Sequence, residues 1–235
     1  MGKRYYFEEI VNFRDLGGYN TKTGKLLKEG RIFRSSMLFG PSKSDLSKWK
    51  NMQITTIIDL RAPKELVTDP NPYANFVSHY FNVNISGSQN AGRASQLAKV
   101  ASSPYFMSDR YLEYVAAEEN IAKACRVFLN HKDKPIVFHC SAEKDRTGVL
   151  SYLLLSLHEV LLPEIIADYQ VSYTYIKHDP RILNSKNNLN VYISYPEIIE
   201  IFDTEFIKKY GSIEAYFSKI GFSSEEIIEL KQLLL

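Results

Sequence analysis

Short apolar runs in the first part of the chain predict β-strands that are buried in a sheet. Residues 54–60 (ITTIIDL) form a β-branched run typical of a strand buried on both faces, and residues 135–139 (PIVFH) form a second such run. Residues 31–34 and 76–83 are further strand candidates. Gly17-Gly18 marks a tight turn. The pattern therefore predicts a small sheet built before residue 140.

Apolar positions at helical spacing dominate the remainder of the chain. Before the last predicted strand, residues 44–51 and residues 109–130 favour helices, the second with breaks. After that strand the predicted helices are 149–158, 163–177, 196–209, 213–220 and 224–234. Strands followed by a central strand–loop–helix and then helices indicate an α/β fold. We expect a short, mostly parallel sheet flanked by helices, with a helical C-terminal half.

One segment departs from this pattern. Residues 86–108 are rich in turn-forming residues at both ends, and residues 93–100 between them favour a short helix. Such a stretch is typical of a mobile insertion or a lid over a site. No repeat or low-complexity linker divides the chain. We therefore expect a single domain over residues 1–235, with residues 86–108 as a candidate lid.

Composition and charge narrow the classes of function. The 235 residues include 29 basic and 27 acidic side chains, a net charge of +2. This balance argues against a nucleic-acid partner, so any preference for an anionic substrate must come from a local patch. Two cysteines, Cys125 and Cys140, are too few for a disulfide scaffold or a multi-cysteine metal site. We expect no metal and no cofactor.

Sequence features also bear on location. Residues 1–9 are charged and lack the apolar core of a secretory signal. The most apolar stretch, residues 149–162, contains His158 and Glu159 and falls short of the roughly 20 residues that span a bilayer. We expect a buried helix there, no transmembrane segment and a cytoplasmic location, with export by a route other than a recognisable signal left open.

The chemistry is concentrated where the strand at 135–139 runs into the helix that follows. His139-Cys140 ends the strand, five residues follow, and Arg146-Thr147 opens the helix. A short loop that closes onto a helix N-terminus directs several backbone N–H groups at one point, which favours an anion there and a thiolate at Cys140. The guanidinium of Arg146 suits bidentate binding of a phosphate. A bound phosphate in line with a thiolate is the arrangement for nucleophilic attack on phosphorus.

The loop residues HCSAEKDRTG resemble the signature of the cysteine-based protein tyrosine phosphatase superfamily. They are most similar to a branch of bacterial tyrosine and lipid phosphatases whose loop reads His-Cys-x-x-Gly-Lys-Asp-Arg-Thr-Gly. Further blocks of that branch occur in the same order along nearly the whole chain. They are Asn12 to Tyr19, Arg31 with Phe33-Arg34-Ser35, Asp59-Leu60-Arg61 followed by Glu65, Asp168-Tyr169, and Gly211-Ser212 with Tyr216 and Gly221.

The resemblance implies hydrolysis of phosphomonoesters through a cysteinyl-phosphate, without a metal. The expected substrates are phosphotyrosine in proteins or peptides and, as a second class, phosphoinositides. Two other functions stay open: a phosphate-binding module with weakened catalysis, and a rhodanese-type sulfurtransferase, which also uses a cysteine in an anion-binding loop. The residues Lys144 to Gly148 argue against the sulfurtransferase, and Glu143 is the one feature that favours the weakened module.

We assign Cys140 as the nucleophile and Arg146 as the phosphate clamp. Asp145 is the candidate general acid, and its alternative is the N-cap of the following helix. Asp59, at a strand end on the same edge, is the alternative acid, unless it pairs with Arg61 or Arg14. The expected substrate-binding residues are Ser141, Ala142, Glu143, Lys144, Thr147 and Gly148, with His139 ordering the loop.

Five expectations concern side-chain placement. Glu143 occupies the position where the resembling branch has glycine, and we expect its carboxylate to point outward. Lys144 should add positive charge over the loop mouth, where the alternative is a solvated lysine. Thr147 can donate a hydrogen bond to the thiolate. Arg14 and Asp15 should pair with each other, and Cys125 should pack in the core, with a resolving thiol for oxidised Cys140 as the alternative.

Overall fold

The computed structural model describes residues 2–86, 105–184 and 189–235. Its sheet has five short strands in the order β1-β2-β5-β3-β4. Four of them run parallel, and only β1 is antiparallel to its neighbour β2. The strands are β1 Phe13–Asp15, β2 Ile32–Ser35, β3 Thr56–Asp59, β4 His79–Asn82 and β5 Ile136–His139. The expected α/β fold with a short, mostly parallel sheet is confirmed.

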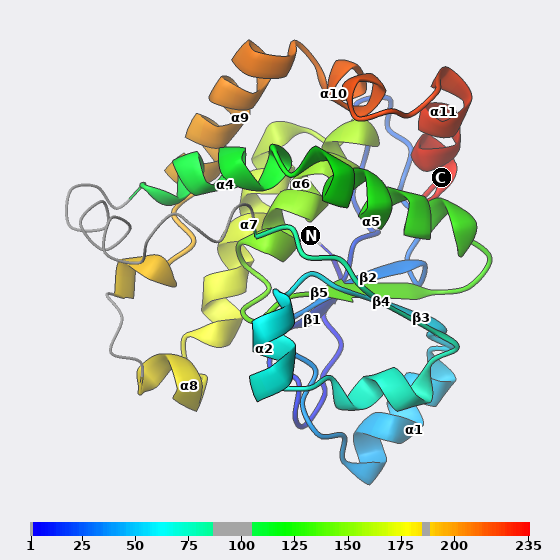
Figure 1. The fold of residues 1–235 in the computed structure, drawn as a ribbon, viewed down its shortest axis with the longest axis vertical. Coiled ribbons are helices and arrows are strands. Elements are labelled where there is room, and N and C mark those ends of the chain that lie inside the picture. Colours follow the sequence, from blue (N-terminus) through cyan, green and yellow to red (C-terminus); the bar gives the residue numbers. More distant parts are fainter. Residues whose placement is uncertain (1, 87–104, 185–188) are drawn as a thin grey trace.

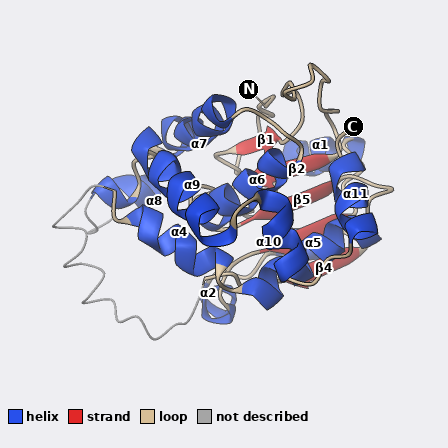
Figure 2. Ribbon diagram, turned by 90° about the horizontal axis from the view of Figure 1, so that it is seen from above, coloured by secondary structure: helices blue, strands red, loops and turns tan. Residues whose placement is uncertain are grey.

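Helices cover both faces of the sheet unequally (Figures 1 and 2). One face carries most of the helical mass, and the other carries α1 and the 3₁₀ helix η1. The helices are α1 Lys43–Asn51, α2 Pro63–Thr68, η1 Pro72–Phe76, α4 Met107–Val115, α5 Glu118–Asn130, α6 Arg146–Leu157, α7 Leu162–Ile176, α8 Pro180–Leu183, η2 Leu189–Val191, α9 Pro196–Tyr210, α10 Ile213–Lys219 and α11 Ser224–Gln232. The C-terminal half is helical, as predicted.

The alternation of side chains along the strands divides the core into two clusters. Ile57 and Val137 lie side by side in the register of β3 and β5 and face the smaller cluster around Trp49. Their neighbours Ile58 and Phe138 face the larger cluster on the opposite side. Because every residue of β3 and β5 is buried, the prediction of strands buried on both faces is confirmed.

Helix α6 lies at the centre of the larger cluster. Ten of its twelve residues are buried, so it presents no polar stripe to solvent. The buried helix expected in this stretch is confirmed, and it begins at Arg146, as expected from the strand–loop–helix and earlier than the apolar spacing alone indicated. Within the described ranges, no helix is long and apolar enough to cross a membrane.

One strand was not predicted, and one predicted segment falls outside the described residues. Residues 13–15 form β1, which precedes the predicted turn at Gly17-Gly18 and whose three residues are too few for a periodic pattern. The helix at 93–100 and most of the candidate lid at 86–108 lie outside the described residues.

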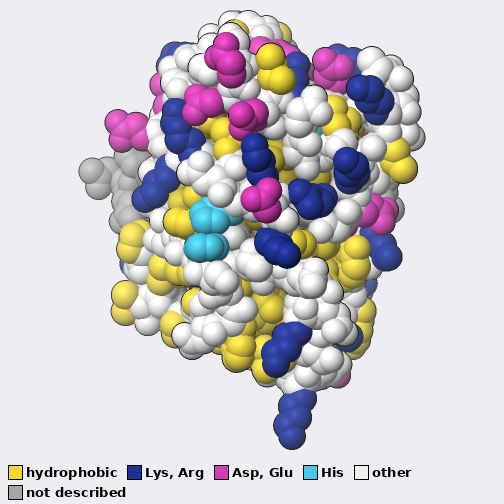
Figure 3. All heavy atoms as spheres, turned by 90° about the vertical axis from the view of Figure 1, so that its right-hand side faces the viewer, with side chains coloured by type: hydrophobic (Ala, Val, Ile, Leu, Met, Phe, Trp, Pro, Cys, Tyr) yellow, Lys and Arg dark blue, Asp and Glu magenta, His cyan; other side chains and the backbone are white. Residues whose placement is uncertain are grey.

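Charge is spread evenly over the visible surface. Figure 3 shows acidic and basic side chains interspersed on one face of the molecule, with apolar side chains between them. This distribution agrees with the net charge of +2 and offers no broad basic surface on that face.

Candidate active site

The site is built on the connection between β5 and α6. The registers of β2, β5 and β3 align Ser35, His139 and Asp59 at one edge of the sheet, and Cys140 follows His139 at this edge. The Cys140 side chain is a free thiol in a residue that is 2% exposed. Parallel strands that end together in this way create the crevice in which α/β proteins bind ligands.

The loop after Cys140 has the backbone of an anion site. Within the described residues, the backbone N–H groups of Ser141 through Asp145 donate hydrogen bonds to no other group. Helix α6 begins immediately after them, so the positive end of its dipole adds to their field. The carbonyl of Ser141 accepts from the Met37 N–H at 3.0 Å, which fixes the loop against the segment after β2. This arrangement can hold a phosphate over the Cys140 sulfur.

Arg146 is held in place by a carboxylate from α2. Its Nη1 and Nη2 donate to Glu65 Oε2 and Oε1 at 2.6 and 3.0 Å, and Nη2 also donates to Ser141 Oγ at 3.2 Å. Ser141 Oγ in turn donates to Glu65 Oε1 at 2.8 Å. Burial opposes ionisation of Glu65, but the bond with Arg146 prevails and lowers the pKa of Glu65 to about 2. The guanidinium is therefore fixed at the loop by a charged partner.

Asp145 does not cap helix α6 through its side chain, although it occupies the N-cap position. Its Oδ1 instead accepts from Tyr111 Oη at 2.6 Å and from Lys144 Nζ at 2.5 Å. Tyr111 Oη also lies 2.8 Å from Tyr169 Oη. Within the described residues Oδ2 has no hydrogen-bond partner, and the side chain is 22% exposed. The capping alternative is therefore wrong, and one carboxylate oxygen is free at the site.

Lys144 is neither a solvated lysine nor an exposed cation over the loop mouth, because its side chain is fully buried. Burial alone would lower the pKa of Lys144, but Asp145 beside it holds that pKa above its usual range. The expectation of charge at the mouth is wrong because Asp145 and Tyr111 offer this ammonium polar partners inside the protein.

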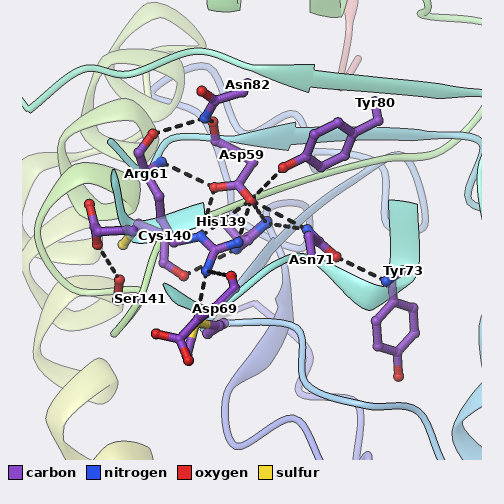
Figure 4. A network of polar contacts seen from close by, with 12 residues as sticks. Asp59, Arg61, Asp69, Asn71, Tyr73, Tyr80, Asn82, His139, Cys140 and Ser141 are labelled. Atoms are coloured by element: carbon purple, nitrogen blue, oxygen red, sulfur yellow. Dashed lines mark hydrogen bonds and ion pairs between the residues drawn. The ribbon is translucent and has the colours of Figure 1, made fainter. Parts of the chain in front are cut away.

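Asp59 is the centre of a separate buried network (Figure 4). Its carboxylate accepts from Arg61 Nε and Nη2 at 2.9 and 2.7 Å and from Tyr80 Oη at 2.9 Å, and His139 Nε2 lies 3.2 Å away. Burial would raise the pKa of Asp59, but His139 and Arg61 together hold it well below its usual range. A carboxyl group kept ionised in this way is a poor proton donor. The alternative that Asp59 pairs with Arg61 is confirmed, whereas Arg14 is not its partner.

His139 connects this network to the loop. Its Nδ1 lies 3.1 Å from the carbonyl of Cys140, and its Nε2 lies 2.9 Å from Asn71 Nδ2. Both ring nitrogens are thus engaged in contacts that fix the start of the loop, as expected for a residue that orders it.

Glu143 does not point outward. Its carboxylate is fully buried and forms ion pairs with Arg14 and Arg34. The expected Arg14–Asp15 pair is also wrong: Arg14 Nη1 donates to Asp168 Oδ1 at 3.0 Å, while Asp15 accepts from the N–H groups of Gly17 and Gly30. Two buried guanidinium groups attract both Glu143 and Asp168, because charges inside a protein require partners.

Three other predicted residues are placed as follows. Thr147 Oγ1 is buried and has no hydrogen-bond partner in the described residues, so a hydrogen bond from it to the Cys140 thiolate stays a prediction. Gly148 lies against Tyr169, whose ring would be 3.4 Å from an added Cβ. Cys125 is buried in the large core cluster, and burial raises the pKa of its thiol to about 12. Core packing of Cys125 is confirmed.

A cavity of about 220 Å³ lies beside the loop. Ser141 and Ala142 form the part of its wall that belongs to the loop, and Met37, Ile176, Ile182 and Tyr192 add apolar surface. The charged residues Arg61, Glu65, Asp69 and Asp179 also line it. The cavity can therefore receive an apolar or aromatic group attached to a phosphate bound in the loop.

Sequence reasoning missed two residues that shape the site. Glu65 was noted as part of a matching block, but its ion pair with Arg146 joins residues that are 81 positions apart. Tyr111 lay in a predicted helix without a motif to mark it, and its contact with Asp145 spans 34 positions. Neither contact has a local sequence signal.

Comparisons with known proteins agree with the geometry. A Cupriavidus necator protein that carries a tyrosine-protein phosphatase name is 29% identical over 170 residues, which cover 69% of this chain and 60% of that protein. The triple specificity protein phosphatase PtpB of Mycobacterium tuberculosis is 26% identical over 185 residues, which cover 67% of this chain and 65% of that protein. The chain thus spans less than two thirds of the length of both relatives.

Among solved structures, the catalytic core of the PP-IP phosphatase SIW14 from S. cerevisiae is similar, with 20% identity and a TM-score of 0.39. The match covers 79% of this chain and 89% of that one. A family model described as the tyrosine phosphatase family matches residues 5–235, which includes every site residue described above. The resemblance seen in the sequence is thereby confirmed, and the chain belongs to the tyrosine phosphatase family.

Proposed function

We propose that this protein hydrolyses phosphomonoesters through a cysteinyl-phosphate on Cys140, with phosphotyrosine in proteins or peptides as its main substrate class. The observation that carries the proposal is the loop after β5. It combines a buried thiol, unpaired backbone N–H groups and the guanidinium of Arg146 around one point. These groups match the charge and shape of a phosphate dianion in line with a nucleophile.

In the first step the Cys140 thiolate attacks phosphorus, an S–P bond forms, and the bond between phosphorus and the ester oxygen breaks. Asp145 donates a proton to that oxygen, so the alcohol or phenol leaves neutral. In the second step water attacks phosphorus, Asp145 takes the proton of the water, and the S–P bond breaks to release phosphate and the thiolate. Arg146 and the loop N–H groups stabilise the charge on the phosphoryl oxygens in both steps.

The two oxygens of Asp145 favour this role. Oδ1 is occupied by Tyr111 Oη and Lys144 Nζ, so a transferable proton belongs on Oδ2, which is free within the described residues. Asp59 is a weaker candidate because four side chains surround its carboxylate and hold it ionised. We therefore place Asp145 as the general acid and base.

The cavity beside the loop supports an aromatic substrate group. Met37, Ile176, Ile182 and Tyr192 offer apolar contacts to such a group. Phosphoinositides stay a second substrate class, as the resemblance of the loop implies. Because Lys144 is fully buried, it offers no exposed cation to a multiply charged headgroup.

Release of phosphate from p-nitrophenyl phosphate in the presence of EDTA tests the proposal. We expect turnover that EDTA does not reduce and that Cys140→Ser abolishes. A phosphate-binding module would bind inorganic phosphate without turnover, and a sulfurtransferase would instead form thiocyanate from thiosulfate and cyanide. Either of those results would contradict the proposal. A panel of phosphotyrosine peptides and phosphoinositides then ranks the two substrate classes.

The partners that follow are phosphorylated protein and lipid headgroups, with no nucleic acid. We place the protein in the cytoplasm, since both of its cysteines are free thiols and a reducing compartment preserves them.

A further inference from the structure

Glu143 sits in the loop in an unusual backbone conformation. Its φ of 65° lies in the left-handed region that residues with a Cβ rarely adopt. At this position the resembling phosphatases have glycine, which enters that region without strain. The chain here accepts a strained glutamate, so some interaction of the side chain must offset the cost.

The side chain makes a dense set of contacts with three separate elements. Arg14 Nη2, from β1, donates to Oε1 and Oε2 at 2.8 and 3.0 Å. Ser172 Oγ, from α7, donates to Oε2 at 2.9 Å, and Asn12 Nδ2 donates to the same oxygen. Arg34 Nε, from β2, lies against Oε1 as an ion pair, although its N–H is not aligned for a hydrogen bond. One loop residue is thus bonded to β1, β2 and α7.

The charges in this cluster balance. Arg14 and Arg34 each contact both Glu143 and Asp168, and all four side chains are at most 2% exposed. Two guanidinium groups and two carboxylates give no net charge beneath the loop. Without Glu143 the cluster would keep one unpaired buried positive charge.

The backbone of Glu143 is fixed as well as its side chain. Arg34 Nη2 donates to the Glu143 carbonyl oxygen at 3.0 Å. In a trans peptide the carbonyl and the following N–H point in opposite directions. The contact with Arg34 therefore directs the N–H of Lys144 away from the buried cluster. An N–H oriented in this way serves an anion site on the other side of the loop.

We propose that Glu143 is a positioning residue that fixes the anion loop in its phosphate-binding conformation before phosphate arrives. The inference rests on the proposed function only in that the loop binds phosphate, and it does not require turnover. The opposite view is that Glu143 weakens binding because its carboxylate repels the dianion. The two views predict opposite signs for the effect of removing that charge.

The experiment compares wild type with Glu143→Gln and Glu143→Gly by measuring the Kd of inorganic phosphate and of vanadate calorimetrically. If the bound conformation of the loop falls to a tenth of the population, the apparent Kd rises about tenfold. We expect the Kd to rise at least tenfold in both variants, although each lacks one negative charge near the ligand. Unchanged or tighter binding would overturn the proposal and favour simple repulsion.

Glu159→Gly is the matched control, because Glu159 also has a positive φ of 59° but lies at the exposed end of α6, where its carboxylate is 3.9 Å from Lys231. We expect wild-type Kd values from this variant. If the Glu143 variants do not fold, Ser172→Ala takes their place. It removes one hydrogen bond to Glu143 Oε2 and leaves every charge in the cluster. It should also weaken the binding of phosphate, by a smaller factor.

A second measurement separates this proposal from the catalytic one. Backbone ¹⁵N order parameters of residues 141–145 in phosphate-free protein report the rigidity of the loop directly. We expect values typical of rigid backbone in wild type and clearly lower values in Glu143→Gln. A rigid wild-type loop without turnover would contradict the proposed function alone, whereas equal order in both proteins would overturn the role of Glu143.

Discussion

At the scale of single residues, two carboxylates of one loop differ because their surroundings differ. Glu143 is fully buried against two arginines, whereas Asp145 is partly exposed and has one free oxygen within the described residues. Glu143 is therefore suited to fix the conformation of the loop, and Asp145 is suited to transfer a proton. Residue type and loop position alone did not distinguish these roles.

Cys140→Ser should abolish turnover and preserve ligand binding. A hydroxyl is a much weaker nucleophile than a thiolate at neutral pH, so kcat should fall by about 10⁴-fold or more. Arg146 and the loop N–H groups are unchanged, so the Kd of vanadate should stay within a few-fold of wild type. Steady-state kinetics and calorimetry check both halves, and substantial activity in this variant would exclude the covalent mechanism.

Asp145→Asn should lower kcat most for substrates with poor leaving groups. An amide cannot donate the proton that an alkyl or phenyl oxygen needs, so we expect a loss of about 10²-fold for phenyl phosphate. The loss should be smaller for p-nitrophenyl phosphate, whose phenolate leaves readily. Asp109→Asn, at an exposed aspartate of α4, is the control. Equal losses for all leaving groups would instead indicate a structural role for Asp145.

Sequence predicted which residues meet at the loop better than it predicted the orientation of their side chains. The proposed nucleophile and clamp, Cys140 and Arg146, follow from a strand, a loop and a helix that are adjacent in the chain. The side chain of Glu143 was placed wrongly because its partner Arg14 is distant in sequence. That of Lys144 was placed wrongly because it turns inward toward the distant Tyr111 as well as toward the adjacent Asp145. Burial of a charge depends on such partners, and a single sequence does not reveal them.

At the scale of elements, α2 and α6 are joined through the active site. Glu65 of α2 binds Arg146 at the start of α6 and also accepts from Ser141 Oγ in the loop. Short α2 has no buried residues of its own, so this carboxylate accounts for much of its attachment to the site. Arg61, which lies just before α2, was recognised as part of a family motif. The helix itself was not predicted, because six residues show no clear periodicity.

Glu65→Gln should remove the ion pair with Arg146 and lower the free energy of unfolding by an amount that depends on pH. The pKa of Glu65 is lowered from 4.5 to about 2 in the folded protein. A carboxyl group with a depressed pKa stabilises the fold above its unfolded pKa and loses that contribution as the pH falls through the folded value. The free energy of unfolding should therefore be lower in Glu65→Gln above about pH 5, and the difference from wild type should shrink between pH 4.5 and about pH 2.

Chemical denaturation at several pH values measures this difference. Glu164→Gln, at an exposed residue of α7, should show no comparable pH dependence. A constant difference across the range would contradict the ion pair as its source. The KM for p-nitrophenyl phosphate should also rise in Glu65→Gln, because Arg146 loses its fixed orientation.

At the scale of the whole molecule, the candidate catalytic loop is attached to α6, in which ten of twelve residues are buried. Leu153→Ala in α6 removes a fully buried side chain and should lower the free energy of unfolding by about 2–5 kcal/mol. Leu26→Ala, at a residue that is 63% exposed, should change it by less than about 0.5 kcal/mol. Denaturant titration compares the two, and similar effects would contradict the packing described here.

The overall fold was the most predictable level. Buried strands and periodic helices gave the α/β class, because burial on two faces produces long apolar runs. The antiparallel β1 was not predicted, since Phe13, Arg14 and Asp15 owe their strand conformation to pairing with β2. Pairing of this kind is a tertiary property and leaves little trace in three residues.

The burial of both thiols has a consequence for labelling the protein. Cys125 is fully buried, and burial raises its pKa to about 12, so it should not react with alkylating reagents while the protein is folded. Cys140 is 2% exposed but follows the strand end at the loop that a phosphate must reach, so a slim reagent such as iodoacetamide should modify it. A bulky maleimide should modify the same sulfur more slowly and leave Cys125 unmodified. Mass spectrometry of the modified sulfurs then reports how much room the site leaves above Cys140, without any substrate.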